Sequence, residues 1–324
     1  KRGYLTDKGV KKAYQEGIGN IAEINFILIS MLNAAGIKAN PVLISTIDNG
    51  IPQFPSRTIF NYVIAAAELD GKQIVLDATN KNTTLNILPL YTLNWIGRLI
   101  RQDGTSQEIN LLPKFLSKKG IFLTTSIDEK GILSGQFREQ KTDYEALKFR
   151  EKYTDVNKEN YLEKVENDLT GIQISDYNIE NSKNLSKPII ENFTFTTNNQ
   201  CEIIGDKMYI NPLLFFTQAK NPFVEEKREL PIYFGYPRQE RYNITIQIPE
   251  GYVVESIPSP VKLVTGQDVG TFAFNIQQME SNIQIVVEQS INGNLISAEF
   301  YDILKEFFQK TIDKQNEKIV LKKI

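Results

Sequence analysis

The chain contains, at residues 61–77, the stretch NYVIAAAELDGKQIVLD. Two runs rich in apolar residues flank the pair Asp70-Gly71, and this pattern predicts a β-hairpin with a two-residue turn. The turn sets the register of the hairpin, in which Tyr62 faces Thr79. Tyr62 and Asp77 are therefore expected on the same face of the sheet, as diagonal neighbours within side-chain reach.

A helix start precedes this hairpin. Asn20 and Glu23 have the spacing of a capping box, with Asn20 as N-cap and Glu23 at N3. The run from 21 to 35 is apolar almost all round, which predicts a helix buried on most of its faces, and Gly36 suits a left-handed C-cap. Residues 41–45 then predict a strand.

The order of buried helix, strand, loop and hairpin resembles the papain-like core of the transglutaminase-like superfamily. In that family a cysteine begins the helix, a histidine lies on one strand and an aspartate lies on the next. Three strings carry the resemblance: GIGNIAE at 17–23, FNYV at 60–63 and LDAT at 76–79. They place Ile21 at the cysteine, Tyr62 at the histidine and Asp77 at the aspartate.

Two of these three positions carry residues that cannot perform the catalytic role that the resemblance assigns to them. Ile21 has no nucleophilic atom, and the Tyr62 phenol has an ordinary pKa near 10, which makes it a poor base at neutral pH. The chain contains no histidine, and its one cysteine, Cys201, lies beyond the matched strings. The sequence therefore predicts a pseudoenzyme without an intact triad, with a binding or structural role toward a protein, peptide or glycan ligand.

Other functions stay open at this point. A hydrolase could use carboxylates, such as Glu225-Glu226 or Glu23 with Asp77, or residues from a missing N-terminal part. The β-rich domains could also pair with other chains in an assembly. No cofactor or metal site is predicted, because the chain lacks histidine and Asp48-Asn49-Gly50 is too short for a calcium loop.

Composition excludes some classes of protein. The 324 residues carry a net charge of −2, without the basic excess of a nucleic-acid-binding protein. No apolar run is long enough to span a membrane, and no signal peptide is evident. Because Lys1 is not a natural start, the sequence is expected to begin inside a longer protein. The resemblance implies that a missing N-terminal domain packs on the core, and that the protein is periplasmic, outer-membrane-associated or secreted.

The predicted fold class is α+β multidomain, with a partial papain-like transglutaminase core followed by β-rich, sandwich-like domains. The core is expected over 1–105 and a mixed α+β domain over 106–200, including a hairpin of 121–126 with 132–140. A β-rich domain is expected over 201–324, closed by an amphipathic helix at 300–314. This last part resembles C-terminal domains of unknown function in transglutaminase-like proteins of Gram-negative bacteria.

Overall fold

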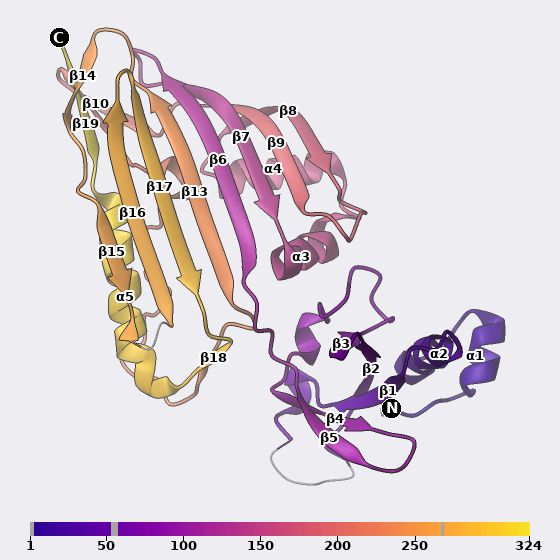
Figure 1. Ribbon diagram of the computed structural model, residues 1–324. Coiled ribbons are helices and arrows are strands. Elements are labelled where there is room, and N and C mark those ends of the chain that lie inside the picture. Colours follow the sequence, from indigo (N-terminus) through magenta and orange to yellow (C-terminus); the bar gives the residue numbers. More distant parts are fainter. Residues whose placement is uncertain (1–2, 53–57, 267–268) are drawn as a thin grey trace. The chain divides into compact units, whose positions relative to one another are not determined.

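The structure, a computed structural model, describes residues 3–52, 58–266 and 269–324 (Figure 1). The chain divides into two compact units, Lys1–Lys114 and Phe115–Ile324. They are called unit 1 and unit 2 below, and each is described by itself.

Unit 1 is built on a five-stranded antiparallel sheet with the order β3-β2-β1-β4-β5. Its strands are β1 Ala39–Ile44, β2 Tyr62–Leu69, β3 Lys72–Leu76, β4 Ile96–Ile100 and β5 Ser106–Asn110. The six residues from Tyr62 to Ala67 are all buried, so β2 is covered on both faces along most of its length.

The predicted hairpin is confirmed from its turn to the pair Ala65–Leu76, where the pairing of β2 with β3 ends. Leu69 pairs with Lys72 and Ala65 with Leu76, as the two-residue turn requires. Asp70 and Gly71 both have positive φ, at 51° and 72°, which is the backbone of a type I′ turn.

Two helices accompany this sheet, α1 Val10–Glu16 and α2 Ile21–Ala34. The predicted capping box at the start of α2 is present, and Gly36 follows the helix with φ of 80°. The prediction that α2 is buried on most faces is wrong: its buried residues are only Ala22, Glu23, Asn25 and Ile29. An apolar stripe on α2 therefore stays partly open.

Unit 2 contains an eight-stranded sheet with the order β15-β16-β17-β13-β6-β7-β9-β8. Neighbouring strands are antiparallel except for β13 and β6, which are parallel. The strands are β6 Ser117–Ile127, β7 Leu133–Lys141, β8 Gln173–Glu180, β9 Ile189–Thr197, β13 Arg238–Gln247, β15 Val261–Val264, β16 Gly270–Met279 and β17 Asn282–Ile291.

One face of this sheet, the inner face, is covered by the other elements of unit 2 (Figure 1). These are three helices, a four-stranded sheet of order β10-β11-β19-β14 and a two-stranded one, β12-β18. Their bounds are α3 Asp143–Tyr153, α4 Lys158–Asp168, α5 Tyr301–Asn316, β10 Cys201–Ile204, β11 Lys207–Ile210, β12 Ile232–Tyr233, β14 Tyr252–Ser256, β18 Leu295–Ile296 and β19 Ile319–Lys323. The opposite face, the outer face, carries exposed or half-buried side chains that alternate with the core residues.

A cluster of charged side chains lies on the inner face, across β13, β6, β7 and β9. Lys141 pairs with both Glu139 and Glu191. Lys119 extends the cluster from Glu139 to Glu240. Because charges are rarely buried without partners, these pairs hold one another in place.

The predicted fold class, α+β with a partial papain-like core, is wrong. The described part of the chain contains nineteen strands and only five α-helices, and unit 1 itself is centred on a sheet. This prediction rested on one helix, the strand at 41–45 and one hairpin, and it did not include β4 and β5 at the far side of that sheet. The expectation of a β-rich downstream part fits unit 2.

The units also differ from the expected division into three domains. Strands β6 to β9 come from residues 106–200, yet they share one sheet with β13 and β15 to β17 from residues 201–324. The sheet is continuous because β13 pairs along its whole length with β6, from Arg238 opposite Ser117 to Gln247 opposite Ser126.

No single helix in the described residues is long and apolar enough to cross a membrane. Only α1 and α2 taken together, with a bend of 93° between them, meet the limits of length and composition for such a span.

Candidate functional site

Asp77 lies at the centre of a buried hydrogen-bond network in unit 1, directly after β3. Its side chain is 6% exposed. The Oδ1 atom accepts hydrogen bonds from Asn25 Nδ2 at 3.1 Å and from the backbone N and Oγ1 of Thr79 at 2.9 and 2.7 Å. The Oδ2 atom accepts from the Tyr62 hydroxyl at 2.7 Å. Four donors therefore surround this carboxylate.

Tyr62 joins the network from the first residue of β2. Its hydroxyl donates to Asp77, as the hairpin register led us to expect, and it also lies 2.7 Å from Thr79 Oγ1 and 3.1 Å from the Tyr91 hydroxyl. The Tyr91 ring meets the Tyr62 ring edge-on, with centroids 5.6 Å apart. Burial and the neighbouring Asp77 charge raise the pKa of Tyr62 far above its ordinary value. The phenol is therefore a neutral hydrogen-bond donor and not a base at neutral pH.

Asn25 is the part of the site whose role the sequence did not reveal. It is fully buried in α2, and its amide donates to Asp77 and to the carbonyl of Val63 while its oxygen accepts from the backbone N of Ala78. One side chain thus connects α2, β2 and the segment after β3. The available signal was a polar residue four positions after Ile21, on the same face of an otherwise apolar helix.

Ile21 is the first residue of α2 and is half-buried, so the structure places a hydrocarbon at the start of the helix. Glu23, 1% exposed, accepts four backbone hydrogen bonds, from Asn20, Asp7, Lys8 and Gly9, at 2.5 to 3.1 Å. Hydrogen bonds from the backbone, first of all from Asn20, lower the pKa of Glu23 despite its burial. Glu23 therefore anchors the segment before α1 to α2, which agrees with a capping role.

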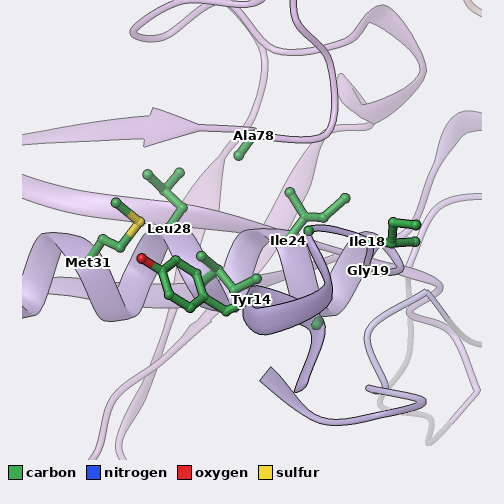
Figure 2. Close-up of a pocket in the computed structure, with 10 residues that line it drawn as sticks. Tyr14, Ile18, Gly19, Ile24, Leu28, Met31 and Ala78 are labelled. Carbon is green, nitrogen blue, oxygen red and sulfur yellow. The ribbon is translucent and has the colours of Figure 1, made fainter. Parts of the chain in front are cut away.

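An apolar hollow of about 400 Å³ adjoins this network between α1, α2 and the end of β3. Figure 2 shows Ile24, Leu28 and Met31 along α2, with Tyr14 from α1 and Ala78 also in the lining. Tyr14 is 66% exposed and Met31 is 58% exposed. Ala78 links the hollow to the Asp77 network through its hydrogen bond with Asn25.

The remaining sequence candidates lie in unit 2. Burial, together with the nearby Asp128 charge, raises the pKa of the half-buried Cys201 thiol on β10 to about 11, so it carries little thiolate at neutral pH. Glu225 and Glu226 are both exposed. Among the described residues no group of three or more acidic or cysteine side chains is placed to hold a metal ion.

Comparison with known proteins supports the fold and gives little about chemistry. A domain of unknown function, DUF3858, matches residues 206–321, which lie within unit 2. A crystal structure from Parabacteroides distasonis, described as a "putative protease", is similar with a TM-score of 0.50 and 14% identity over 97% of this chain. The chain spans about half of that protein, since the match covers 46% of it. No curated protein matches this sequence.

Proposed function

We propose that unit 1 is a non-catalytic relative of transglutaminase-like domains with a binding or structural role. The supporting observation is the hydrogen bond from Tyr62 to Asp77, at the two positions where the resemblance puts histidine and aspartate. In an active site of that kind the aspartate orients the imidazole that moves protons. Here it holds a phenol whose pKa is raised, and Ile21 stands where the nucleophile is expected. The proposed location, in the cell envelope or outside the cell, rests on the same resemblance.

A hydrolase is the alternative, because the similar solved structure is described as a "putative protease". The geometry gives little support to a hydrolase that uses carboxylates for catalysis. A general acid or base needs a proton or lone pair that faces the substrate, whereas Glu23 and Asp77 each already accept four hydrogen bonds from the protein. Glu225 and Glu226 are both exposed, so neither lies in the enclosed environment in which a general acid works.

Assays of the 324-residue chain are expected to show no peptide hydrolysis and no amine incorporation into glutamine above a heat-denatured control. The physical reason is the lack of a base and a thiolate at the site. Fluorogenic peptide mixtures and a labelled-amine assay measure the two reactions. Turnover that disappears in the Asp77→Asn variant would contradict the proposal, because it would show that the Asp77 network performs chemistry.

We also propose that the apolar hollow binds a polypeptide segment of the same protein outside residues 1–324. The hollow is lined by apolar side chains, which are stabilised when another apolar surface covers them. More than half of the similar solved structure lies outside its match with this chain, since the match covers 46% of that protein.

A photo-crosslinking residue placed at Met31 in the full-length gene product is expected to give a cross-link within the same polypeptide. The matched control is position 69, where Leu69 is 44% exposed on the hairpin and outside the hollow. Mass spectrometry of the cross-linked peptides identifies the partner. A Met31 cross-link only to other proteins, or none beyond the level at position 69, would count against an internal partner.

A further inference from the structure

A second hollow, of about 380 Å³, lies on the outer face of the eight-stranded sheet, across β6, β7, β9 and β8. The face that contains it is turned to the viewer in Figure 1, opposite the helices of unit 2. Its lining includes one exposed ring, Phe122, which is 47% exposed. The other outer-face side chains in the lining are polar: Thr124, Gln136, Arg138, Asp176, Asn192 and Thr194.

Strand register arranges these side chains in two parallel rows. Phe122, Arg138 and Asn192 are direct cross-strand neighbours, and so are Thr124, Gln136 and Thr194 in the next row. Each row spans two strand spacings, about 10 Å, so one aromatic ring and several polar groups can contact one extended ligand.

Three of these side chains have no polar partner among the residues that the structure describes. In the described residues of unit 2, no hydrogen bond or ion pair engages the side chains of Gln136, Arg138 or Asn192. Together they offer guanidinium and amide donors and two amide oxygens, all in planar groups. A ligand rich in hydroxyl groups could satisfy both kinds of group at once.

A β-bulge adds a carboxylate to the same hollow. The pairing of β8 with β9 shifts between Ser175 and Asn178, and Asp176 within that shift has a positive φ of 50°. A positive φ at a residue other than glycine costs conformational energy. Here the bulge directs Tyr177 inward, where its hydroxyl donates to Glu191 at 2.9 Å, and it leaves Asp176 exposed. Asp176 Oδ2 accepts a hydrogen bond from Thr194 Oγ1 at 3.0 Å, which holds the carboxylate over the outer face.

The charge of the hollow indicates the class of ligand. Arg138 and Asp176 balance each other, so the hollow lacks the positive excess that a nucleic acid or an acidic polymer needs. An extended peptide adds to the edge of a sheet, where backbone groups are free, and not to its face. An apolar ligand would bury the polar groups without partners.

We propose that this hollow binds a neutral oligosaccharide. The C–H face of a sugar ring packs on Phe122, and the sugar hydroxyl groups exchange hydrogen bonds with Arg138, Gln136, Asn192 and Asp176. The site is in unit 2, so the proposal is independent of what unit 1 does.

Calorimetric titration of the 324-residue chain with neutral hexasaccharides tests this proposal. The panel contains β-1,4- and β-1,3-glucans, an α-1,4-glucan, xylan, mannan and chitin oligomers, with a hexagalacturonate as the acidic member. At least one neutral member is expected to bind, and Phe122→Ala and Arg138→Ala are each expected to weaken that binding about tenfold.

Gln136→Ala has a matched control in Gln277→Ala, a glutamine on β16 outside the hollow. Gln136→Ala is expected to weaken binding and Gln277→Ala to leave it unchanged. Phe122, Arg138, Gln136 and Gln277 are all exposed, so the melting temperature of each variant should stay within about 2 °C of the parent. This measurement separates lost binding from lost folding. The proposal is overturned if no neutral member binds at 10 mM ligand, if only the hexagalacturonate binds, or if Phe122→Ala and Arg138→Ala bind like the parent.

Discussion

Replacing Asp77 by alanine is expected to lower the free energy of unfolding of unit 1 by about 3 kcal/mol. The carboxylate accepts four hydrogen bonds from donors on α2, on β2 and in the segment after β3. Its loss leaves the Tyr62 hydroxyl and the Asn25 amide with fewer acceptors in a buried place, where an unpaired donor costs about 1–3 kcal/mol. The effect is large because one side chain joins three separate segments.

The matched control for this change is Asp48→Ala, in the short 3₁₀ helix Ile47–Asn49 of the same unit, where the aspartate is exposed. That variant should change the free energy of unfolding by no more than about 0.5 kcal/mol. Tyr62→Phe should fall between the two, near 1 kcal/mol, because it removes a single donor. Hydrogen exchange of the β2 and β3 amides measures unit 1 separately from unit 2. Equal losses in Asp77→Ala and Asp48→Ala would refute a central role for the network.

The hairpin could be predicted from the sequence because its signals are local. Asp70-Gly71 favours one turn type, and that turn sets which residues face each other. The contact between Tyr62 and Asp77 followed from this register alone. The capping box of α2 is equally local, since it depends on two residues three positions apart.

The role of Asn25 depends on tertiary structure, and for that reason the sequence did not reveal it. A polar residue in an apolar helix has no preferred partner until the helix packs against β2 and the end of β3. Helix α1 was missed because it has only seven residues and no clear apolar period. Its preceding segment is held by the carboxylate of Glu23, which is distant in sequence.

The eight-stranded sheet shows the same limit on a larger scale. Its strands β6 and β7 lie close to the predicted hairpin of 121–126 with 132–140, because alternation of apolar and polar residues marks each strand separately. The order of the strands in the sheet could not be predicted from such local patterns, because the parallel pairing of β13 with β6 joins segments that are far apart in the chain. A boundary drawn near residue 200 therefore separated strands that belong to one sheet.

Replacing Glu191 by alanine is expected to cost unit 2 about 3–5 kcal/mol, the largest effect among these variants. Glu191 on β9 is 2% exposed and pairs with Lys141 at 2.5 Å. It also accepts hydrogen bonds from Tyr161 at 2.5 Å and from Tyr177 at 2.9 Å. Its removal leaves the half-buried Lys141 with Glu139 as its remaining partner. It also leaves the hydroxyl groups of two half-buried tyrosines without this acceptor.

A double-mutant cycle isolates the pair. Lys141→Met alone should also be costly, because it leaves Glu139 and Glu191 as neighbouring buried carboxylates. Lys141→Met combined with Glu191→Leu should cost less than the two single changes added, with a coupling above about 1 kcal/mol. Urea unfolding monitored at unit 2 amides measures each variant. The exposed pair Lys164–Asp168 on α4 is the control, and Asp168→Ala should cost under about 0.5 kcal/mol.

The same cluster predicts how the stability of unit 2 depends on pH. Burial alone would lower the pKa of Lys141, but Glu139 and Glu191 outweigh it and raise the pKa above the ordinary 10.5. The folded protein then keeps a proton that the unfolded chain releases, so this stability is present below about pH 10 and is lost as pH rises through the folded pKa. Burial raises the pKa of Tyr161 and Tyr177 as well, and these groups act in the same direction.

The loss of stability of unit 2 at low pH depends on Glu240. Burial would raise its pKa, but Lys119 and the Tyr242 hydroxyl outweigh burial and lower it below 4.5, so its stabilising effect is lost as pH falls through that lowered value. Unfolding measured from pH 3 to 11 should therefore show a plateau with a loss of stability at each end. Lys141→Met should make the alkaline loss shallower without removing it, because Tyr161 and Tyr177 still contribute to that loss. An alkaline limb equally steep in Lys141→Met and in the parent would show that Lys141 contributes little to the pH dependence.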